Sequence, residues 1–100
     1  MADFSESSFS VDADFNSVKF YKIANFCNSK FQEDVSFLKT YFAEDAIFSG
    51  SRFKGYADFE NSIFKKNTYF NKCYFTDAFM DDTIFEKKLF LNNSRYDRYI

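Results

Sequence analysis

The residue types that could carry out chemistry are few and poorly matched in this chain. It has no His, so it lacks an imidazole base and the commonest metal ligand. Cys27 and Cys73 lie far apart in the sequence, and neither has a neighbouring base that would activate a thiolate. Gly50 and Gly55 are not followed by the Lys-Ser or Lys-Thr of a phosphate-binding loop. We therefore predict no catalytic residue, no metal site and no cofactor site, and we expect that the protein is not an enzyme.

Pairs of adjacent acids are the best candidates for cation ligands, because hard cations prefer carboxylate oxygens. The sequence contains them at Glu33-Asp34, Glu44-Asp45 and Asp81-Asp82. Each pair falls at an expected corner between repeated segments. We therefore interpret these acids as solvated turn residues rather than as a metal site.

The elements that would have to position any such residue are defined by a repeat of phenylalanine. It recurs in alternating steps of five and six residues, at Phe4, Phe9, Phe15, Phe20, Phe26, Phe31, Phe37, Phe42, Phe48, Phe53, Phe59, Phe64, Phe70 and Phe75. After a shift the series resumes at Met80, Phe85 and Phe90, and only Phe79 of the 17 Phe lies outside it. Helical faces recur every three or four residues and strands alternate every two, so this longer period predicts a solenoid.

A second regularity places a small residue two positions before each large one. Examples are Ala24 before Phe26 and Ala46 before Phe48. In an extended segment, residues two apart point the same way, so both are expected to face inward. Most serines occupy such small inward positions, and we interpret them as spacers. Cys73 is expected at an inward position and Cys27 at an outward one.

The tripeptides Ala2-Asp3-Phe4, Ala13-Asp14-Phe15, Ala24-Asn25-Phe26 and Ala57-Asp58-Phe59 resemble the motif of the pentapeptide-repeat family. The resemblance covers about residues 2–90. It implies an all-β fold, a right-handed quadrilateral β-helix with four short sides per turn and about 4–5 coils. The six-residue intervals depart from the family pattern and predict a bulge at two corners of each coil. We assign residues 1–91 to the β-solenoid and residues 92–100 to a C-terminal cap or tail.

A coil of 22 residues predicts which rings stack on one another. We expect columns of Phe4, Phe26, Phe48, Phe70 and Phe90; Phe9, Phe31, Phe53 and Phe75; Phe15, Phe37, Phe59 and Met80; and Phe20, Phe42, Phe64 and Phe85. The tail allows two alternatives. Either a short helix begins at Asn93 or Ser94, with Tyr96, Tyr99 and Ile100 on one face, or Tyr96 is one more inward residue of the solenoid.

The charge pattern disfavours direct binding of nucleic acid. The formal net charge is -2, whereas a nucleic-acid-binding domain usually carries a basic footprint. Residues 1–50 carry -4 and residues 51–100 carry +2, which makes the chain mildly dipolar. There is no apolar run of the roughly 20 residues that a membrane span needs, and the repeat leaves no room for a signal peptide. We expect a cytoplasmic protein with reduced thiols and no membrane contact.

The outward residues that precede each ring change from polar to apolar along the chain. By the column assignment, an apolar patch forms on two adjacent sides in the C-terminal half, at Tyr41, Ile47, Ile63, Tyr69, Ile84 and Leu89. Such patches mark contact surfaces, although Ile and Tyr also suit any strand. We expect a scaffold that binds a protein partner or forms a homodimer. The family resemblance implies an alternative, inhibition of DNA gyrase by DNA mimicry, which this modest negative charge supports poorly.

Overall fold

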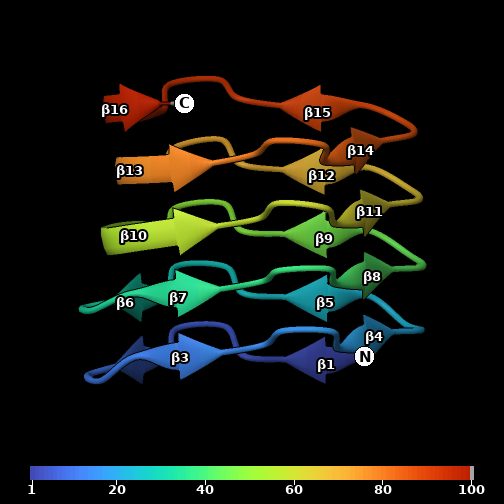
Figure 1. Cartoon of the computed structure of the whole chain (residues 1–100), viewed down its shortest axis with the longest axis horizontal. Coiled ribbons are helices and arrows are strands. Elements are labelled where there is room, and N and C mark those ends of the chain that lie inside the picture. Colours follow the sequence, from blue (N-terminus) through green and yellow to red (C-terminus); the bar gives the residue numbers. More distant parts are fainter. Residues whose placement is uncertain (100) are drawn as a thin grey trace.

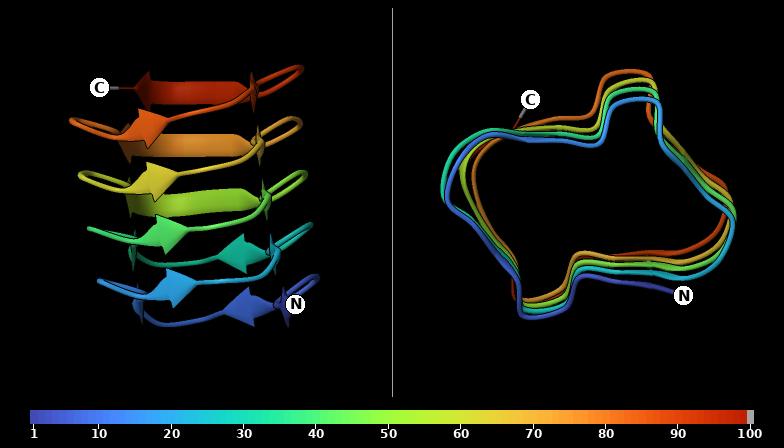
Figure 2. Two further views of the ribbon diagram at one scale, coloured as in Figure 1. Left: turned by 90° about the vertical axis from the view of Figure 1, so that its right-hand side faces the viewer. Right: turned by 90° about the horizontal axis from the view of Figure 1, so that it is seen from below.

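The chain winds into a four-sided coil of short parallel strands, as seen from the side in Figure 1 and along the axis in Figure 2. The computed structural model describes residues 1–99. Within that range there is no helix long and apolar enough to cross a membrane. We name the four sides A to D in the order in which the chain visits them.

Each side is a stack of strands from successive coils. Side A consists of β1 (Ala2–Asp3), β5 (Ala24–Asn25), β9 (Ala46–Ile47), β12 (Thr68–Tyr69) and β15 (Leu89–Phe90). Side D consists of β4 (Lys19–Phe20), β8 (Tyr41–Phe42), β11 (Ile63–Phe64) and β14 (Ile84–Phe85). Side B contains β2 (Ser8–Phe9), β6 (Lys30–Phe31) and the first residues of β10 (Arg52–Asp58), β13 (Tyr74–Phe79) and β16 (Arg95–Tyr99). Side C contains β3 (Ala13–Asp14), β7 (Val35–Ser36) and the last residues of β10, β13 and β16.

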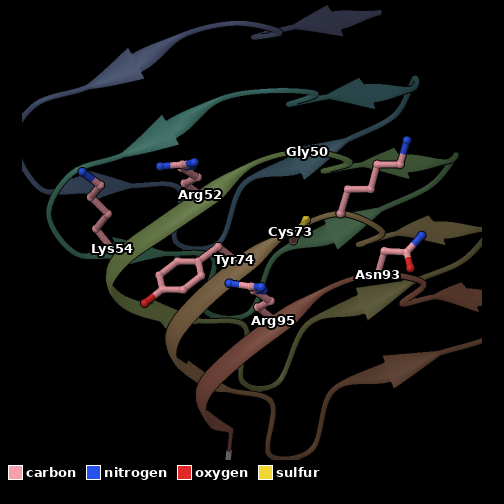
Figure 3. A pocket seen from close by; sticks show the side chains of 8 residues that line it. Gly50, Arg52, Lys54, Cys73, Tyr74, Asn93 and Arg95 are labelled. Carbon is pink, nitrogen blue, oxygen red and sulfur yellow. The ribbon is translucent and has the colours of Figure 1, made fainter.

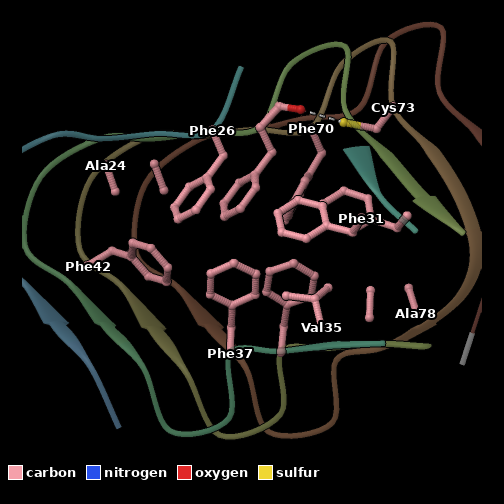
Figure 4. Packing of buried hydrophobic residues seen from close by; sticks show 14 of the residues in the cluster. Ala24, Phe26, Phe31, Val35, Phe37, Phe42, Phe70, Cys73 and Ala78 are labelled. Atoms are coloured by element: carbon pink, nitrogen blue, oxygen red, sulfur yellow. Dashed lines mark hydrogen bonds between the residues drawn. The ribbon is translucent and has the colours of Figure 1, made fainter. Parts of the chain in front are cut away.

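The core is a set of stacked phenylalanine columns inside this coil (Figure 4). The rings of Phe26 and Phe48 lie parallel, with centroids 5.1 Å apart and an interplanar angle of 4°. Phe31 and Phe53 stack in the same way at 5.0 Å. Rings of neighbouring columns meet edge to face, which is the other favourable arrangement of aromatic pairs. The predicted inward pairing of small and large residues is confirmed, since Ala24 and Ala46 are fully buried beside these rings.

The predicted place of Phe90 in the first column is wrong. Phe90 aligns with Tyr69, not with Phe70, and its ring stacks on the outward-facing ring of Tyr69 at 4.8 Å. Leu89 takes the inward place above Thr68 and packs against the core. The reason is that this coil is only one residue shorter than the one below it, at the bend within β13 between sides B and C, where the register with β10 shifts. The corner between sides D and A keeps its six-residue length, so the large position after Phe85 falls on Leu91.

The small inward positions are of two chemical kinds. Those that begin side A or side C are mostly Ala, whereas those that precede side B or side D are mostly Ser, Thr or Cys. Ser51 shows why: its hydroxyl donates to the carbonyl oxygen of Phe26 at 2.6 Å and accepts the N–H of Ser29 at 3.1 Å. Thr40 repeats the donation, to the carbonyl of Phe15 at 3.0 Å. The sequence interpretation of these serines as spacers is therefore incomplete, because their hydroxyls add hydrogen bonds to backbone groups that the turn pairs only at long distance, as with the Ser29 N–H and the Phe26 carbonyl at 3.3 Å.

Two kinds of corner join the sides. At the five-residue corners the third turn residue has a positive φ, and only Gly50 of the nine such residues in the described range is a glycine. The Asp or Asn of the family-like tripeptides supports this turn: Asp14 Oδ1 accepts the N–H of Asn16 at 2.8 Å. At the six-residue corners an acid links one coil to the next. Asp34 Oδ1, for example, accepts the N–H of Tyr56 at 2.9 Å.

The tail continues the solenoid as strand β16, which pairs with β13. The Tyr96 ring stacks on Phe75 with centroids 5.3 Å apart and 3° between the planes. Of the two alternatives for the tail, the structure therefore has the inward rung, and the helix proposed to begin at Asn93 or Ser94 is wrong. Its last proposed residue, Ile100, lies outside the described residues.

Replacing Phe42 by Ala should lower the free energy of unfolding by about 3–5 kcal/mol. Phe42 is only 1% exposed, and its ring stacks between Phe20 and Phe64. Denaturant unfolding followed by circular dichroism measures the loss. Tyr21→Ala is the control, because Tyr21 is 66% exposed and its removal should change stability by no more than about 0.5 kcal/mol. Equal stabilities of the two variants would contradict the stacked core.

The small inward positions predict opposite changes in stability for two substitutions that remove a hydroxyl. Ser51→Ala should cost about 1–3 kcal/mol, because two buried hydrogen bonds are lost and only the longer bond from the Ser29 N–H to the Phe26 carbonyl remains. Thr68→Val should be neutral or stabilising. On side A, Thr68 occupies the small inward position that Ala46 fills in the coil below. Its buried hydroxyl has no hydrogen-bond partner within residues 1–99. The same unfolding experiment compares them, and a larger loss in Thr68→Val than in Ser51→Ala would refute the assignment.

Candidate functional site

Apolar and aromatic side chains gather on the outer surface of sides D and A in the C-terminal coils. Strands β8, β11 and β14 align three of them, and β9, β12 and β15 align the other three. We call these residues the apolar patch: Tyr41, Ile47, Ile63, Tyr69, Ile84 and Phe90. Ile84 is 51% exposed, and the other members are partly exposed. The two columns lie on either side of one six-residue corner of the coil, which carries charged residues between them.

The structure brings together five of the residues that the sequence predicted for this surface. Leu89 does not belong to it, because its side chain faces the core. Phe90 takes the place that Leu89 was expected to hold, for the register reason given above. The ring of Phe90 extends the outer column by stacking on Tyr69.

The same two columns are polar in the first coils. On side D the residue below Tyr41 is Lys19. On side A the residues below Ile47 are Asn25 and Asp3. Strand preference acts equally on all coils, so it does not account for apolar residues that occur only in the later ones.

Lysines surround the corner between the two columns of the patch. Lys65 forms an ion pair with Glu86, with 2.9 Å between Nζ and Oε2, and this hydrogen bond raises the pKa of Lys65. Lys66, Lys87 and Lys88 are exposed on the same corner, and no ion pair joins them to another residue in the described part of the chain. The same corner carries Glu44 and Asp45 in the coil below, so lysines predominate only in its two later coils, which we call the lysine rim of the patch.

The acid pairs have structural roles where the structure gives them contacts. Asp34 and Asp45 each accept a backbone N–H from the coil above, at 2.9 Å and 3.0 Å. Glu60 lies near Asp58 and Asp81, and repulsion from Asp58 is the largest cause of its raised pKa. Across residues 1–99, His, Cys, Asp and Glu form no group of three or more that could hold a metal ion.

Sequence reasoning missed a basic cavity on side B, which is shown in Figure 3. Its charged lining residues are Arg52, Lys54, Lys72 and Arg95, with Tyr74 between the two arginines. They are dispersed in the sequence, and the net charge of -2 conceals them. Writing the outward residues in coil register would have revealed them.

The two cysteines lie as predicted from the repeat. Cys73 is buried at the small inward position before side B that Ser51 occupies in the coil below. Its thiol donates to the carbonyl oxygen of Phe48 at 2.9 Å (Figure 4). Burial raises the pKa of Cys73 to about 12, so the group stays a neutral thiol near neutral pH. Cys27 is partly exposed in a turn, and both cysteines are free.

Comparisons with known proteins identify the repeat. A family model described as pentapeptide repeats (9 copies) matches residues 15–63, 29–73 and 48–95, which together cover well over half of the chain. No curated protein and no solved structure matches it.

The buried thiol predicts a loss of stability at high pH. Below about pH 8.5 Cys73 is protonated in both the folded and the unfolded chain, so its contribution to stability does not vary. Between that value and about 12 only the folded chain holds the proton, so stability falls as the pH rises. Urea unfolding at about pH 8 and about pH 10.5 should show a larger decrease in the native chain than in Cys73→Ser. An identical decrease in both would contradict this prediction.

Proposed function

The chain belongs to the pentapeptide-repeat family, and we propose that it is a rigid scaffold that binds a protein partner through the apolar patch. The observation that carries this proposal is the confinement of apolar outward residues to the later coils of sides D and A. Exposed contiguous apolar surface costs solubility unless a partner covers it.

The rim of the patch specifies the chemistry of that partner. Lys66, Lys87 and Lys88 outnumber Glu44 and Asp45 on this corner, so a two-fold contact would bring together two surfaces that each have an excess of positive charge. An apolar partner surface edged by Asp or Glu complements them, and such complementarity favours both correct pairing and rapid association. We therefore propose an acidic-rimmed partner rather than a homodimer through this face.

The size of the patch sets the kind of contact. It spans three coils spaced by about 4.8 Å, so it is only about 10 Å high between its first and last strands. A stable interface usually buries more than about 1,000 Å² in total. A partner that binds here therefore also contacts the lysine rim, or binds as a short segment with modest affinity.

DNA mimicry is a weaker candidate, because it requires continuous rows of negative charge. On side C, Asp14 and Asp58 are separated by Ser36 and followed by Phe79. Side B, next to it, carries basic residues. A gyrase supercoiling assay in which the protein inhibits at micromolar concentration would favour mimicry over the scaffold proposal.

Changing Ile63 and Tyr69 together to Ser should abolish capture of the partner in pull-downs from the native host. The matched control is V11S/Y56S, which also removes one aliphatic and one tyrosine side chain but lies outside the patch and away from its rim. A protein retained by the native chain and the control, but lost with I63S/Y69S, supports the proposal.

Two outcomes would contradict it. Partners that bind equally to both variants would place the contact elsewhere. A dimer seen by light scattering that I63S/Y69S disperses would mean that a second copy, and not an acidic partner, covers the patch.

A further inference from the structure

A second surface of the molecule concentrates positive charge in a hollow. The cavity on side B (Figure 3) has a volume of about 530 Å³, and side B is opposite side D in the order of the four sides. Four of its lining residues are cationic: Arg52, Lys54, Lys72 and Arg95. None of its lining residues is acidic.

Within the part of the chain that the structure describes, none of these cations forms an ion pair. The ion pair found within residues 1–99 joins Lys65 and Glu86, on another corner of the coil. Asp97 contacts the lining, because its carboxylate accepts a hydrogen bond from the Tyr74 hydroxyl. This bond is the largest cause of the raised pKa of Tyr74, so the phenol stays neutral and adds no negative charge. Asp97 thus supplies one negative charge beside four cations, and this excess of positive charge favours a bound anion.

The strands fix the spacing of the two arginines. Arg52, Tyr74 and Arg95 follow one another on β10, β13 and β16, so the backbones that bear the arginines are about 10 Å apart at about 4.8 Å per coil. The rings of Phe53 and Phe75, buried beneath β10 and β13, hold this spacing. Lys54 and Lys72 approach from the corners on either side. The backbones of the two arginines are therefore fixed along the axis of the coil, with one lysine at the corner on each side.

The surroundings limit the length of the anion. Past the corner that follows Lys54, side C presents a second hollow lined by Asp12, Asp14, Asp34 and Asp58. A polyanion long enough to extend from side B across the corner to side C would be repelled by these carboxylates. A short polyanion on side B would not reach them. Phosphate groups suit the arginines best, because a guanidinium can donate two parallel hydrogen bonds to phosphate oxygens.

We propose that the side B cavity binds a short polyphosphate chain, with Arg52 and Arg95 contacting its phosphate groups and Lys54 and Lys72 neutralising the remaining charge. The site is separate from the apolar patch, so it does not depend on the proposed protein contact. The same chemistry occurs in an inorganic polyphosphate and in the triphosphate of a nucleotide.

Calorimetric titration of the full chain at low salt tests the proposal, with inorganic tripolyphosphate, adenosine triphosphate and orthophosphate as probes. Tripolyphosphate should bind saturably with one molecule per chain, and orthophosphate at least about tenfold more weakly, because it spans fewer cations. Equal affinity for the nucleotide would mean that the site recognises the phosphates alone. Tighter binding of the nucleotide would mean that Tyr74 or its neighbours also contact the base.

The variant R52E/R95E should weaken tripolyphosphate binding by at least about tenfold. Its matched control is K19E/K22E, which makes the same change in net charge at exposed positions away from the cavity. Circular dichroism verifies that both variants fold. Absence of saturable binding, or an equal loss in both variants, would overturn the proposal, since an equal loss indicates general attraction to a charged surface.

Discussion

The structure depends on the narrow bore of the coil, which has room for one aromatic ring and one small side chain on each side. Rings in one column repeat from coil to coil at about the spacing of parallel strands, so the same residue type satisfies both the stacking and the backbone pairing. The second inward position is so close to the backbone that a hydroxyl there reaches the carbonyl of the coil below, as Ser51 does. Core packing and backbone hydrogen bonding are thus satisfied by the same two positions.

The sequence predicted this core well because its signal is periodic. The stacking of Phe26 on Phe48 and the burial of Ala24 follow directly from the spacing of large and small residues. The wrong assignment of Phe90 to the first column arose because its residue type fits the column but the pairing of β12 with β15 does not place it there. An aromatic residue was assigned to the column, whereas the backbone ladder carries Leu89 inward and Phe90 outward. Contacts such as Asp34 with the N–H of Tyr56 could not be predicted, because they require the path of a corner as well as the period.

The surfaces were predicted only in part, for the same reason. The patch could be found by writing outward residues in columns, and five of its six members were assigned this way. The basic cavity draws on Arg52 and Arg95 from separate coils together with Lys54 and Lys72 from the corners. Total charge conceals such a cluster, because acids on side C cancel it in the sum. The scaffold therefore carries surfaces of opposite charge on two adjacent sides, basic on side B and acidic on side C.

The loss of one residue between Phe75 and Asp77 in β13 shows how the fold accommodates changes in chain length. Pairing with β10 is interrupted after Phe53 and resumes at Tyr56 opposite Asp77, so the disturbance ends within a single bend. Insertions and deletions at these bends can thus remodel the exterior while the interior lattice remains in phase. A family built on this plan can diversify its recognition surfaces by small edits in gene length, without having to redesign the hydrophobic interior each time.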